Sequence, residues 1–541
     1  MARDSEPPAG MAASTGDDPS APAPVAAADA PFPPLRAVLG FALMCVGMFM
    51  AILDIQIVAA SLGEIQAGLA ASADEISWVQ TSYLVAEVVM IPLSGFLMRA
   101  WGMRNLFALS AGGFVIASIA CASATTIEQM IAFRALQGFL GGAMIPVTYA
   151  ISFVLFPRRY QTQVTVAVAL LVTLAPTIGP SLGGWLTDSL SWRWIFLINI
   201  APGLLCTLGV LALVPAGRMA PGLLRRIDLL GLLFMALFLA GLDFVLEEGS
   251  RHDWFEDSAI LRVAIVSAVA SVLFLWRATT AAEPIVDLRP LTNRNFAAGC
   301  TLQLVMGFGL FGLTYLYPLF LGRVGGLSAG QIGATVWVTG LTMLVSAPIF
   351  GRLARLTDPR LICSAGFLLL AASCWASLGL TAEWRFDQFV LPQVLRGMGL
   401  MCCIVSTTVI AFATLSDEQA SVGSPLITLM RNLGGALGLG IINTVFAARF
   451  DLHWSRLSEW ATLAREETAA LLERLGRLAE TRGLDPDTAP VAMLARMTAR
   501  EAAIMSYSDV FAVLMWLFLA MAILPWLLRR PPTFLTARPA D

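Results

Sequence analysis

Lysine is absent from the 541 residues, so every basic side chain apart from the two histidines is an arginine. The phosphate-binding loop of the common ATPases requires a lysine, which argues against ATP hydrolysis by this chain. Histidine occurs only at His252 and His453, and none of the eight cysteines has the spacing of a zinc ligand set. The cysteines lie in apolar segments, where this residue usually packs as a small hydrophobe. The sequence therefore predicts no metal site, no disulfide framework and no cofactor.

Charged residues are also scarce: they make up 13% of the chain, against roughly 25% in soluble domains. Hydrophobic residues make up 57%, and the mean hydropathy is +0.77. About fourteen runs of roughly twenty apolar residues follow one another, each long enough to cross a bilayer as a helix. They lie near residues 37–60, 78–98, 105–124, 128–150, 164–187, 194–214, 229–247, 259–276, 296–320, 331–350, 361–381, 389–413, 422–447 and 507–528. We therefore expect an all-α polytopic membrane protein.

Arginines are distributed unevenly between the predicted loops. If the amino terminus lies in the cytoplasm, the short outer loops hold only Arg193, Arg251, Arg323 and Arg385. Cytoplasmic loops carry the excess of basic residues in membrane proteins, so this asymmetry predicts that both termini are cytoplasmic. Residues 1–34 are rich in alanine, proline, serine and aspartate and lack the pattern of a signal peptide, so we expect an uncleaved, disordered tail.

A short motif, Gly-x-Leu-x-Arg, occurs at residues 95–99 and again at residues 351–355, each time at the inner end of an apolar helix. This repeat predicts two duplicated six-helix halves, a recurrent plan among transporters. The predicted parts are a six-helix half over 35–215, two inserted helices and linkers over 216–295, a second six-helix half over 296–528, and a cytoplasmic tail over 529–541. The second half contains a long charged extracytoplasmic loop over 450–506. This loop is either a solvated cap or a docking surface for a partner, and the sequence leaves both open.

Ionisable side chains inside the membrane are costly and are functional candidates by default. Glu87 lies about nine residues into the second segment, roughly 14 Å deep at 1.5 Å per residue, near the midplane. Removal from water favours the protonated form of a carboxyl group. A proton that binds from outside and leaves inside can then bias a transporter between two shapes. The alternative is that Glu87 only pairs with an arginine to fix helix packing.

Asp54 and Arg134 are the other predicted proton-coupling residues. Asp54 lies toward the outer part of the first segment. There it either takes part in proton coupling or is simply exposed to solvent. Arg134 can hold the charged form of a nearby carboxyl group in one state and release it in the other, or bind backbone carbonyls permanently. The secondary candidates are Gln137, Asp243, Arg396 and Arg431. The acids just beyond the seventh segment, Glu247, Glu248 and Asp253, are expected to be solvated loop residues.

Residues 164–187 contain helix-bending and small residues in one stretch: Pro176, Gly179, Pro180, Gly183 and Gly184. The prolines lack N–H groups, so backbone carbonyls one turn away lose their partners and the helix can bend. Ala175, Gly179 and Gly183 fall four apart on one face, where another helix can approach closely. The stretch is either a bend-and-contact helix in a protein that rocks between two shapes or a simple packing groove.

Several motifs together resemble one family. The Gly-Pro-x-x-Gly-Gly motif at 179–184 resembles the fifth-helix antiporter motif of the major facilitator superfamily. The motif Trp-Arg-Trp-Ile-Phe at 192–196, with Asn199, resembles the drug-exporting EmrB/QacA family. Further similar motifs are Leu-Asp-x-x-Ile-Val at 53–58, the start of the second helix at 78–86, Arg134-x-x-Gln137-Gly138, Asp-Trp-Phe at 253–255 and Pro-Ile-Val-Asp-Leu at 284–288.

The resemblance implies the major facilitator fold, with two six-helix halves plus two inserted helices, in the cell inner membrane. It implies proton-driven efflux of hydrophobic or amphipathic drugs and toxic compounds by alternating access, with Arg134 in proton coupling. Gram-negative relatives work with a periplasmic adaptor (membrane fusion) protein and an outer-membrane channel. The alternative is a dedicated exporter of a metabolite, fatty acid or siderophore with the same fold.

Some positions depart from the family pattern. Arg99 stands where an acidic residue is usual, which puts the usual interhelical salt bridge in doubt. Ala59, Gly63 and Ala175 also replace motif residues, and Glu87 stands where many relatives have a neutral residue. A membrane-embedded enzyme would need a cluster of acid, histidine or metal-binding residues on a loop, and none is seen, so we expect no enzyme. A non-transporting receptor or assembly factor is the remaining class.

Overall fold

The computed structural model describes the chain from Phe32 to Leu528 with short gaps. The described residues are 32–217, 219–251, 254–327, 329–415, 417–462, 465–481, 484–485 and 488–528. The predicted tails therefore lie outside the described residues, except for residues 32–34.

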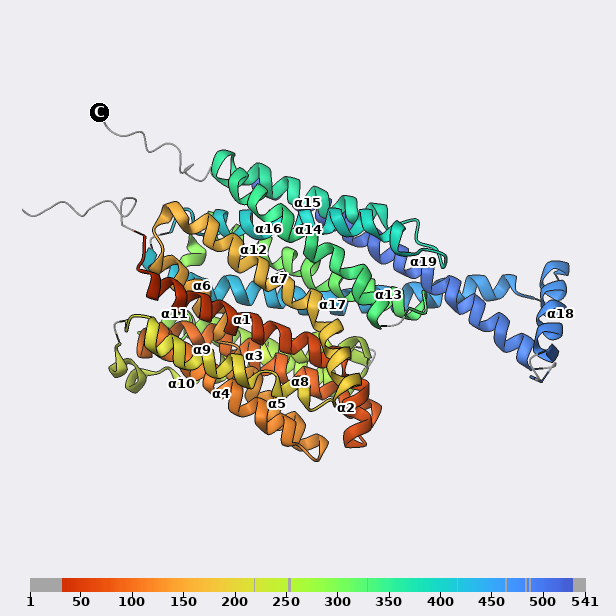
Figure 1. Cartoon of the computed structure of the whole chain (residues 1–541), viewed down its shortest axis with the longest axis horizontal. Coiled ribbons are helices and arrows are strands. Elements are labelled where there is room, and N and C mark those ends of the chain that lie inside the picture. Colours follow the sequence, from red (N-terminus) through yellow and green to blue (C-terminus); the bar gives the residue numbers. More distant parts are fainter. Residues whose placement is uncertain are drawn as a thin grey trace, which may run out of the picture.

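The described chain forms an all-helical bundle (Figure 1). The helices of the first half are α1 (Leu35–Ala60), α2 (Leu62–Leu69), α3 (Ala73–Trp101), α4 (Met103–Ser123), α5 (Ile127–Gly141), α6 (Met144–Leu155), α7 (Arg158–Ser189), α8 (Trp194–Leu197) and α9 (Ile200–Leu213). The inserted pair is α10 (Leu229–Glu248) and α11 (Ser258–Thr280). The second half contains α12 (Arg294–Gly307), a π-helical turn η5 (Phe308–Gly312), α13 (Leu313–Arg323), α14 (Ala329–Leu356), α15 (Pro359–Ala376), α16 (Phe386–Phe412), α17 (Asp417–Trp460), α18 (Glu466–Thr481) and α19 (Ala489–Met521).

Thirteen candidate membrane spans among the described residues are long and apolar enough to cross a membrane. The remaining predicted segment, 164–187, lies within the single helix α7. The predicted all-α polytopic fold is therefore confirmed. Three predicted segments are interrupted: 128–150 is divided into α5 and α6 at Gly142, 194–214 is divided into α8 and α9 after Leu197, and 296–320 contains the π-helical turn. Such turns often occur at functional sites in helices.

The sequence repeat marks equivalent contacts between the halves. A side-chain carbon added at Gly95 of α3 would lie 3.2 Å from the ring of Pro425 in α17. One added at Gly351 of α14 would lie 3.0 Å from Val166 in α7. Each repeated glycine therefore faces the other half, where the absence of a side chain lets the two helices approach closely.

Arg99, the departure from the family motif, contacts the linker after α11. Its Nη1 lies 3.9 Å from Oε2 of Glu283, and its Nη2 donates to the carbonyl oxygen of Pro284 at 3.4 Å. Both side chains of this ion pair are about one-third exposed, so the pair contributes little to stability.

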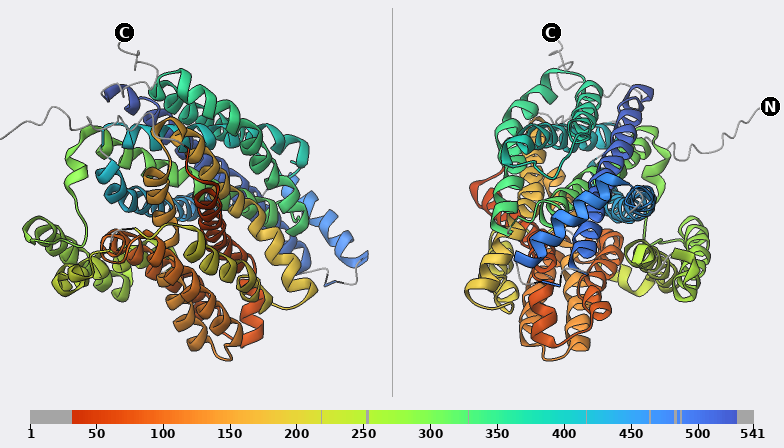
Figure 2. Two further views of the ribbon diagram at one scale, coloured as in Figure 1. Left: turned by 60° about the vertical axis from the view of Figure 1, so that its left-hand side comes forward. Right: turned by 90° about the vertical axis from the view of Figure 1, so that its right-hand side faces the viewer.

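The inserted helices lie at the side of the bundle (Figure 2), and α10 contacts both halves. Helix α10 packs against α3 of the first half and α17 of the second. Thr81 of α3 donates a hydrogen bond to Glu248 at 2.9 Å, and the Trp254 indole donates to Thr444 of α17 at 2.9 Å. The insert therefore bridges the two halves.

The predicted loop 450–506 is largely helical. Helices α17 and α19 extend beyond the rest of the bundle, and α18 lies across their ends (Figure 1). The last membrane helix begins at Ala489 rather than near residue 507, because the chain continues α19 outward without a break. Helix α1 begins and α19 ends at the opposite end of the bundle from α18 (Figure 1).

Candidate functional site

A buried ion pair joins α1 to α5. Nη1 of Arg134 lies 2.6 Å from Oδ2 of Asp54, and both side chains have no exposed surface. The structure thus brings together two of the three predicted proton-coupling residues. The alternative in which Asp54 is simply exposed to solvent is wrong, because α5 and α9 cover this part of α1 and leave Asp54 1% exposed.

Two amides complete the surroundings of Asp54. Its Oδ1 accepts hydrogen bonds from Nε2 of Gln137 at 3.1 Å and from Nδ2 of Asn199 at 2.7 Å. The Oε1 of Gln137 accepts from Nη1 of Arg134 at 2.6 Å, and its Nε2 also donates to Ser118 at 2.8 Å. We call these five residues, Asp54, Ser118, Arg134, Gln137 and Asn199, the Asp54 cluster. A buried charge is tolerated only when it is paired and hydrogen-bonded, and the cluster gives the Asp54 carboxyl group one guanidinium and two amide partners.

Close packing of α5 on α3 positions Arg134. A side-chain carbon added at Gly138, one turn after Arg134, would lie 2.2 Å from the carbonyl oxygen of Tyr83. Glycine therefore permits an approach that places the Arg134 guanidinium 4.2 Å from the centre of the Tyr83 ring. The Arg134 Nε also donates to the carbonyl oxygen of Val79 at 3.1 Å. Binding to a carbonyl is thus one of its contacts, and the ion pair with Asp54 is another.

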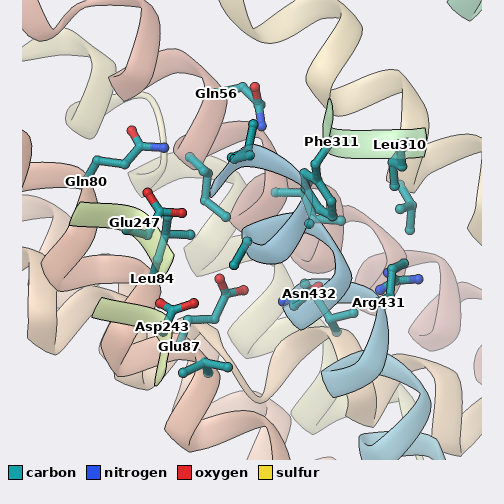
Figure 3. A pocket seen from close by; sticks show the side chains of 18 residues that line it. Gln56, Gln80, Leu84, Glu87, Asp243, Glu247, Leu310, Phe311, Arg431 and Asn432 are labelled. Atoms are coloured by element: carbon teal, nitrogen blue, oxygen red, sulfur yellow. The ribbon is translucent and has the colours of Figure 1, made fainter. Parts of the chain in front are cut away.

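Glu87 lies in a separate central cavity of about 100 Å³ between the halves (Figure 3). The polar residues that line it are Gln56, Gln80, Glu87, Asp243, Glu247, Arg431 and Asn432. Leu310 and Phe311 of the π-helical turn also line it. A cavity of this size holds a few water molecules and not a drug-sized ligand. A larger compound would fit here only if the halves separated around this cavity.

The carboxyl groups of Glu87 and Asp243 lie next to each other in the cavity (Figure 3). Glu87 is 2% exposed and Asp243 is 4% exposed. One oxygen of each has no hydrogen-bond partner among the described residues. Within the described chain Glu87 also forms no ion pair, so the alternative in which it pairs with an arginine to fix packing is not what the structure contains.

Arg431 lines the same cavity from α17. It is 3% exposed, and its Nη1 donates to the Tyr149 hydroxyl at 3.3 Å. The cavity is therefore lined by carboxyl groups from α3 and α10 and by one guanidinium from α17. Two predicted secondary residues, Asp243 and Arg431, thus join Glu87, whereas Gln137 belongs to the Asp54 cluster.

Arg396 is not part of either group. Its Nη1 donates to Gln393 at 3.2 Å, its Nη2 donates to Thr314, and its guanidinium lies 5.6 Å from the centre of the Tyr317 ring. The order Arg-x-x-Gln-Gly at 134–138 is reversed to Gln-x-x-Arg-Gly at 393–397. No carboxylate pairs with Arg396 among the described residues, in contrast to Arg134.

The predicted small-residue face of α7 packs on α1 just after Asp54. Side-chain carbons added at Gly179 and Gly183 would lie 2.4 Å from Cβ of Gln56 and 2.9 Å from the carbonyl oxygen of Ile57. Helix α7 continues through residues 176–184, which include Pro176, Pro180 and Gly184. The structure does not describe the side chain of Pro176. The close approach is present, and a role in conformational change stays a prediction.

Sequence reasoning missed several site residues. Ser118 and Asn199 were not among the predicted site residues. Asn199 could have been found, because it is a polar residue in an apolar segment and belongs to a family motif. The expectation that Glu247 and Glu248 are solvated loop residues was wrong in part, because both lie in the last turn of α10. Glu248 is 3% exposed, whereas Glu247 is half-buried and lines the cavity. Asp253 lies outside the described residues.

Comparisons with known proteins agree with this architecture. Residues 44–439 match the Major Facilitator Superfamily. The chain is 36% identical over 483 residues to the colistin resistance protein EmrB of Acinetobacter baumannii, covering 89% of this chain and 94% of that protein. It is 29% identical to the multidrug export protein EmrB of Escherichia coli, covering 89% and 93%. It is 28% identical to the fatty acid resistance protein FarB of Neisseria gonorrhoeae, covering 92% and 98%.

A solved structure shares the fold. The crystal structure of the human organic anion transporter MFSD10 (TETRAN) aligns with a TM-score of 0.53 at 14% identity, covering 89% of this chain and 99% of that one. At this identity the likeness concerns the fold alone. With the matched family, the related sequences and the helical architecture in agreement, this chain belongs to the major facilitator superfamily and to its EmrB/QacA branch.

Proposed function

We propose that this protein exports hydrophobic or amphipathic compounds across the inner membrane in exchange for protons, by alternating access. The observation that carries the proposal is the fully buried Asp54–Arg134 ion pair beside a cavity between the two halves. Relatives named for multidrug export, colistin resistance and fatty acid resistance support the substrate class. Both termini then lie in the cytoplasm, which is supported by the arginine distribution and by the position of α18 at the opposite end of the bundle from the start of α1 and the end of α19.

The ion pair provides a way for a proton to change the balance between conformations. Protonation of Asp54 removes the negative charge that Arg134 faces, while the charge of Arg134 remains buried. Leaving one partner of a buried pair uncompensated costs about 3–5 kcal/mol. Shifting a two-state equilibrium from 1:99 to 99:1 takes about 5.5 kcal/mol. Proton binding at this one site therefore supplies a large part of the free energy that moves the protein out of the conformation described here.

Glu87 is the second proposed proton-coupling residue. Its carboxyl group lines the cavity and forms no ion pair within 4.0 Å among the described residues. A proton or a positively charged group of a substrate can therefore bind to this carboxyl group. A proton and a cationic substrate then compete for the same carboxyl group, and such competition couples inward proton movement to outward export.

A second candidate is a dedicated exporter of a fatty acid or another carboxylate. Arg431 favours it, because its guanidinium lines the cavity and forms no ion pair among the described residues. Transport of a panel of cationic, neutral and anionic compounds by the purified protein in vesicles separates the two. A broad panel of exported cations supports the drug pump, and movement of long-chain carboxylates alone supports the narrow exporter.

The experiment that tests proton coupling uses vesicles containing purified protein and an imposed pH gradient. We expect the wild type to move dye only with the gradient and to lose this movement when an uncoupler is added. Asp54→Asn and Glu87→Gln should lose gradient-driven movement, whereas Asp451→Asn, an exposed aspartate of α17, should retain it. Gradient-driven export at the wild-type rate in both site variants would contradict the proposed coupling.

We also propose that a periplasmic adaptor protein, itself joined to an outer-membrane channel, binds the projecting region formed by α18 and the ends of α17 and α19. Helix α18 has exposed charged residues on one side and packs on α19 with the other. Deletion of residues 463–484 should abolish copurification of an adaptor while leaving dye export in vesicles unchanged. Loss of vesicle export together with copurification would argue instead for a structural role.

A further inference from the structure

A groove lies where α17 and α19 leave the bundle toward α18. It has a volume of about 430 Å³, and its lining residues come from the end of α13, from α17 and from α19. They are Arg323, Val324, Phe446, Phe450, Arg496, Ala499, Arg500, Ala503 and Tyr507. We call it the outer groove. It is separate from the Asp54 cluster and from the central cavity.

The outer groove is strongly positive. Three of its lining residues are arginines, and none is acidic. Arg500 is held by the carbonyl oxygen of Val324, which accepts from its Nε at 3.2 Å and from its Nη2 at 2.9 Å. These neutral contacts orient the guanidinium without compensating its charge. Arg323 and Arg496 are exposed and form no ion pair among the described residues.

Asp509, two residues after Tyr507 in α19, does not balance this charge. Asp509 of α19 is engaged elsewhere, with Arg449 at 3.5 Å and His453 at 2.8 Å. The arginines of the groove thus form an unbalanced group of charges. A guanidinium binds phosphate oxygens in a planar, often bidentate geometry, so phosphate is the anion that this group suits.

The rest of the groove is apolar. The rings of Phe446 and Tyr507 lie 4.7 Å apart between their centres, and those of Phe446 and Phe450 lie 6.2 Å apart. Tyr507 is fully buried, and its hydroxyl has no hydrogen-bond partner among the described residues. A buried hydroxyl left without a partner is costly, which indicates that a ligand absent from the protein chain completes this site.

We propose that the outer groove binds an anionic phospholipid. Its phosphate lies among Arg323, Arg496 and Arg500, the Tyr507 hydroxyl donates to an oxygen of the headgroup, and an acyl chain runs along the aromatic rings. Three features favour a lipid over a free anion. The groove has an apolar wall, its volume is larger than an inorganic anion needs, and it lies where α17 and α19 leave the bundle. The phosphate of an anionic headgroup is the partner that a guanidinium binds with charge-assisted, often bidentate hydrogen bonds.

The test measures lipid binding by full-length protein purified in detergent, using native mass spectrometry. Phosphatidylglycerol is compared with phosphatidylcholine carrying the same acyl chains, and inorganic phosphate is added as a competitor. We expect one retained phosphatidylglycerol and about thirtyfold weaker binding in the double variant Arg323→Gln/Arg496→Gln. Tyr507→Phe, which keeps the ring, should weaken binding about fivefold.

The matched control is Arg474→Gln/Arg477→Gln, which removes two exposed arginines from α18 and should bind as the wild type does. Equal binding of phosphatidylcholine, or wild-type binding by the Arg323/Arg496 double variant, would overturn the proposal. Full displacement of the lipid by millimolar inorganic phosphate would identify a small-anion site and would also overturn it. Because no step of the test involves transport, its outcome is independent of the proposed export function.

Discussion

Replacing Asp54 by asparagine tests the central ion pair directly. The change keeps the size of the side chain and one oxygen, so Asn199 and Gln137 keep an acceptor while Arg134 loses its counter-charge. Breaking a buried ion pair from one side costs about 3–5 kcal/mol, and the retained hydrogen bonds place the expected loss near 3 kcal/mol. This corresponds to a change of roughly a hundredfold in the equilibrium between folded and unfolded protein.

The assay is thermal unfolding of the detergent-purified protein at neutral pH. We expect a clearly lower unfolding midpoint for Asp54→Asn and for Arg134→Gln, and a partial recovery in the double variant, which contains neither charge. Recovery is expected because replacing both partners removes the uncompensated buried charge. Gradient-driven export should stay absent in the double variant, since a stable cluster without an ionisable carboxyl group cannot exchange a proton.

The reasoning would be refuted by additive losses in the double variant, because additivity means that the two charges do not interact in the folded state. A midpoint for Asp54→Asn equal to that of Asp451→Asn would refute it as well. Either result would mean that the ion pair does not exist in the dominant conformation of the protein.

Three further changes test other parts of the structure. Gly138→Ala places a carbon 2.2 Å from a carbonyl oxygen of α3, so we expect a loss of about 1–3 kcal/mol and a lower unfolding midpoint, whereas Gly63→Ala, with open space around it, should leave the midpoint unchanged. Glu87→Gln should fold normally but lose uncoupler-sensitive dye export; Glu473→Gln on α18 is the matched control, and export equal to it would exclude Glu87 from coupling. Trp254→Phe removes the 2.9 Å hydrogen bond from the insert to α17. The expected cost in stability of about 1 kcal/mol should appear as faster proteolysis of the 216–295 region. Proteolysis at the wild-type rate would show that this hydrogen bond does not hold the insert.

Long-range pairing explains most of what sequence reasoning missed. The order Arg-x-x-Gln at 134–137 places both side chains on one helix face, but only packing shows that the acid they meet is Asp54 rather than Glu87. Asn199 comes from yet another helix. The acids at the end of α10 were expected to be solvated loop residues, and this failed for Glu248 because α10 packs against α3 and α17.

The sequence by itself determined the all-helical membrane class, the approximate position of each span and the family. Hydrophobicity along one segment is a local sum, and a helix in a bilayer satisfies its own backbone, so these properties need no knowledge of neighbours. The sequence also identified Asp54, Glu87 and Arg134 as unusual, because a charge within an apolar run is costly wherever the run lies.

Only the tertiary structure decided which of these charges meet. The Asp54–Arg134 pair joins residues from different helices, the Glu87–Asp243 contact joins the first half to the insert, and the outer groove combines residues from three helices. Close approach at small residues is part of this packing: Gly138 of α5 lies against α3, and Gly183 of α7 lies against α1. The geometry of a polar contact changes within a few tenths of an ångström, and such distances follow from the packing of the whole bundle rather than from any one segment.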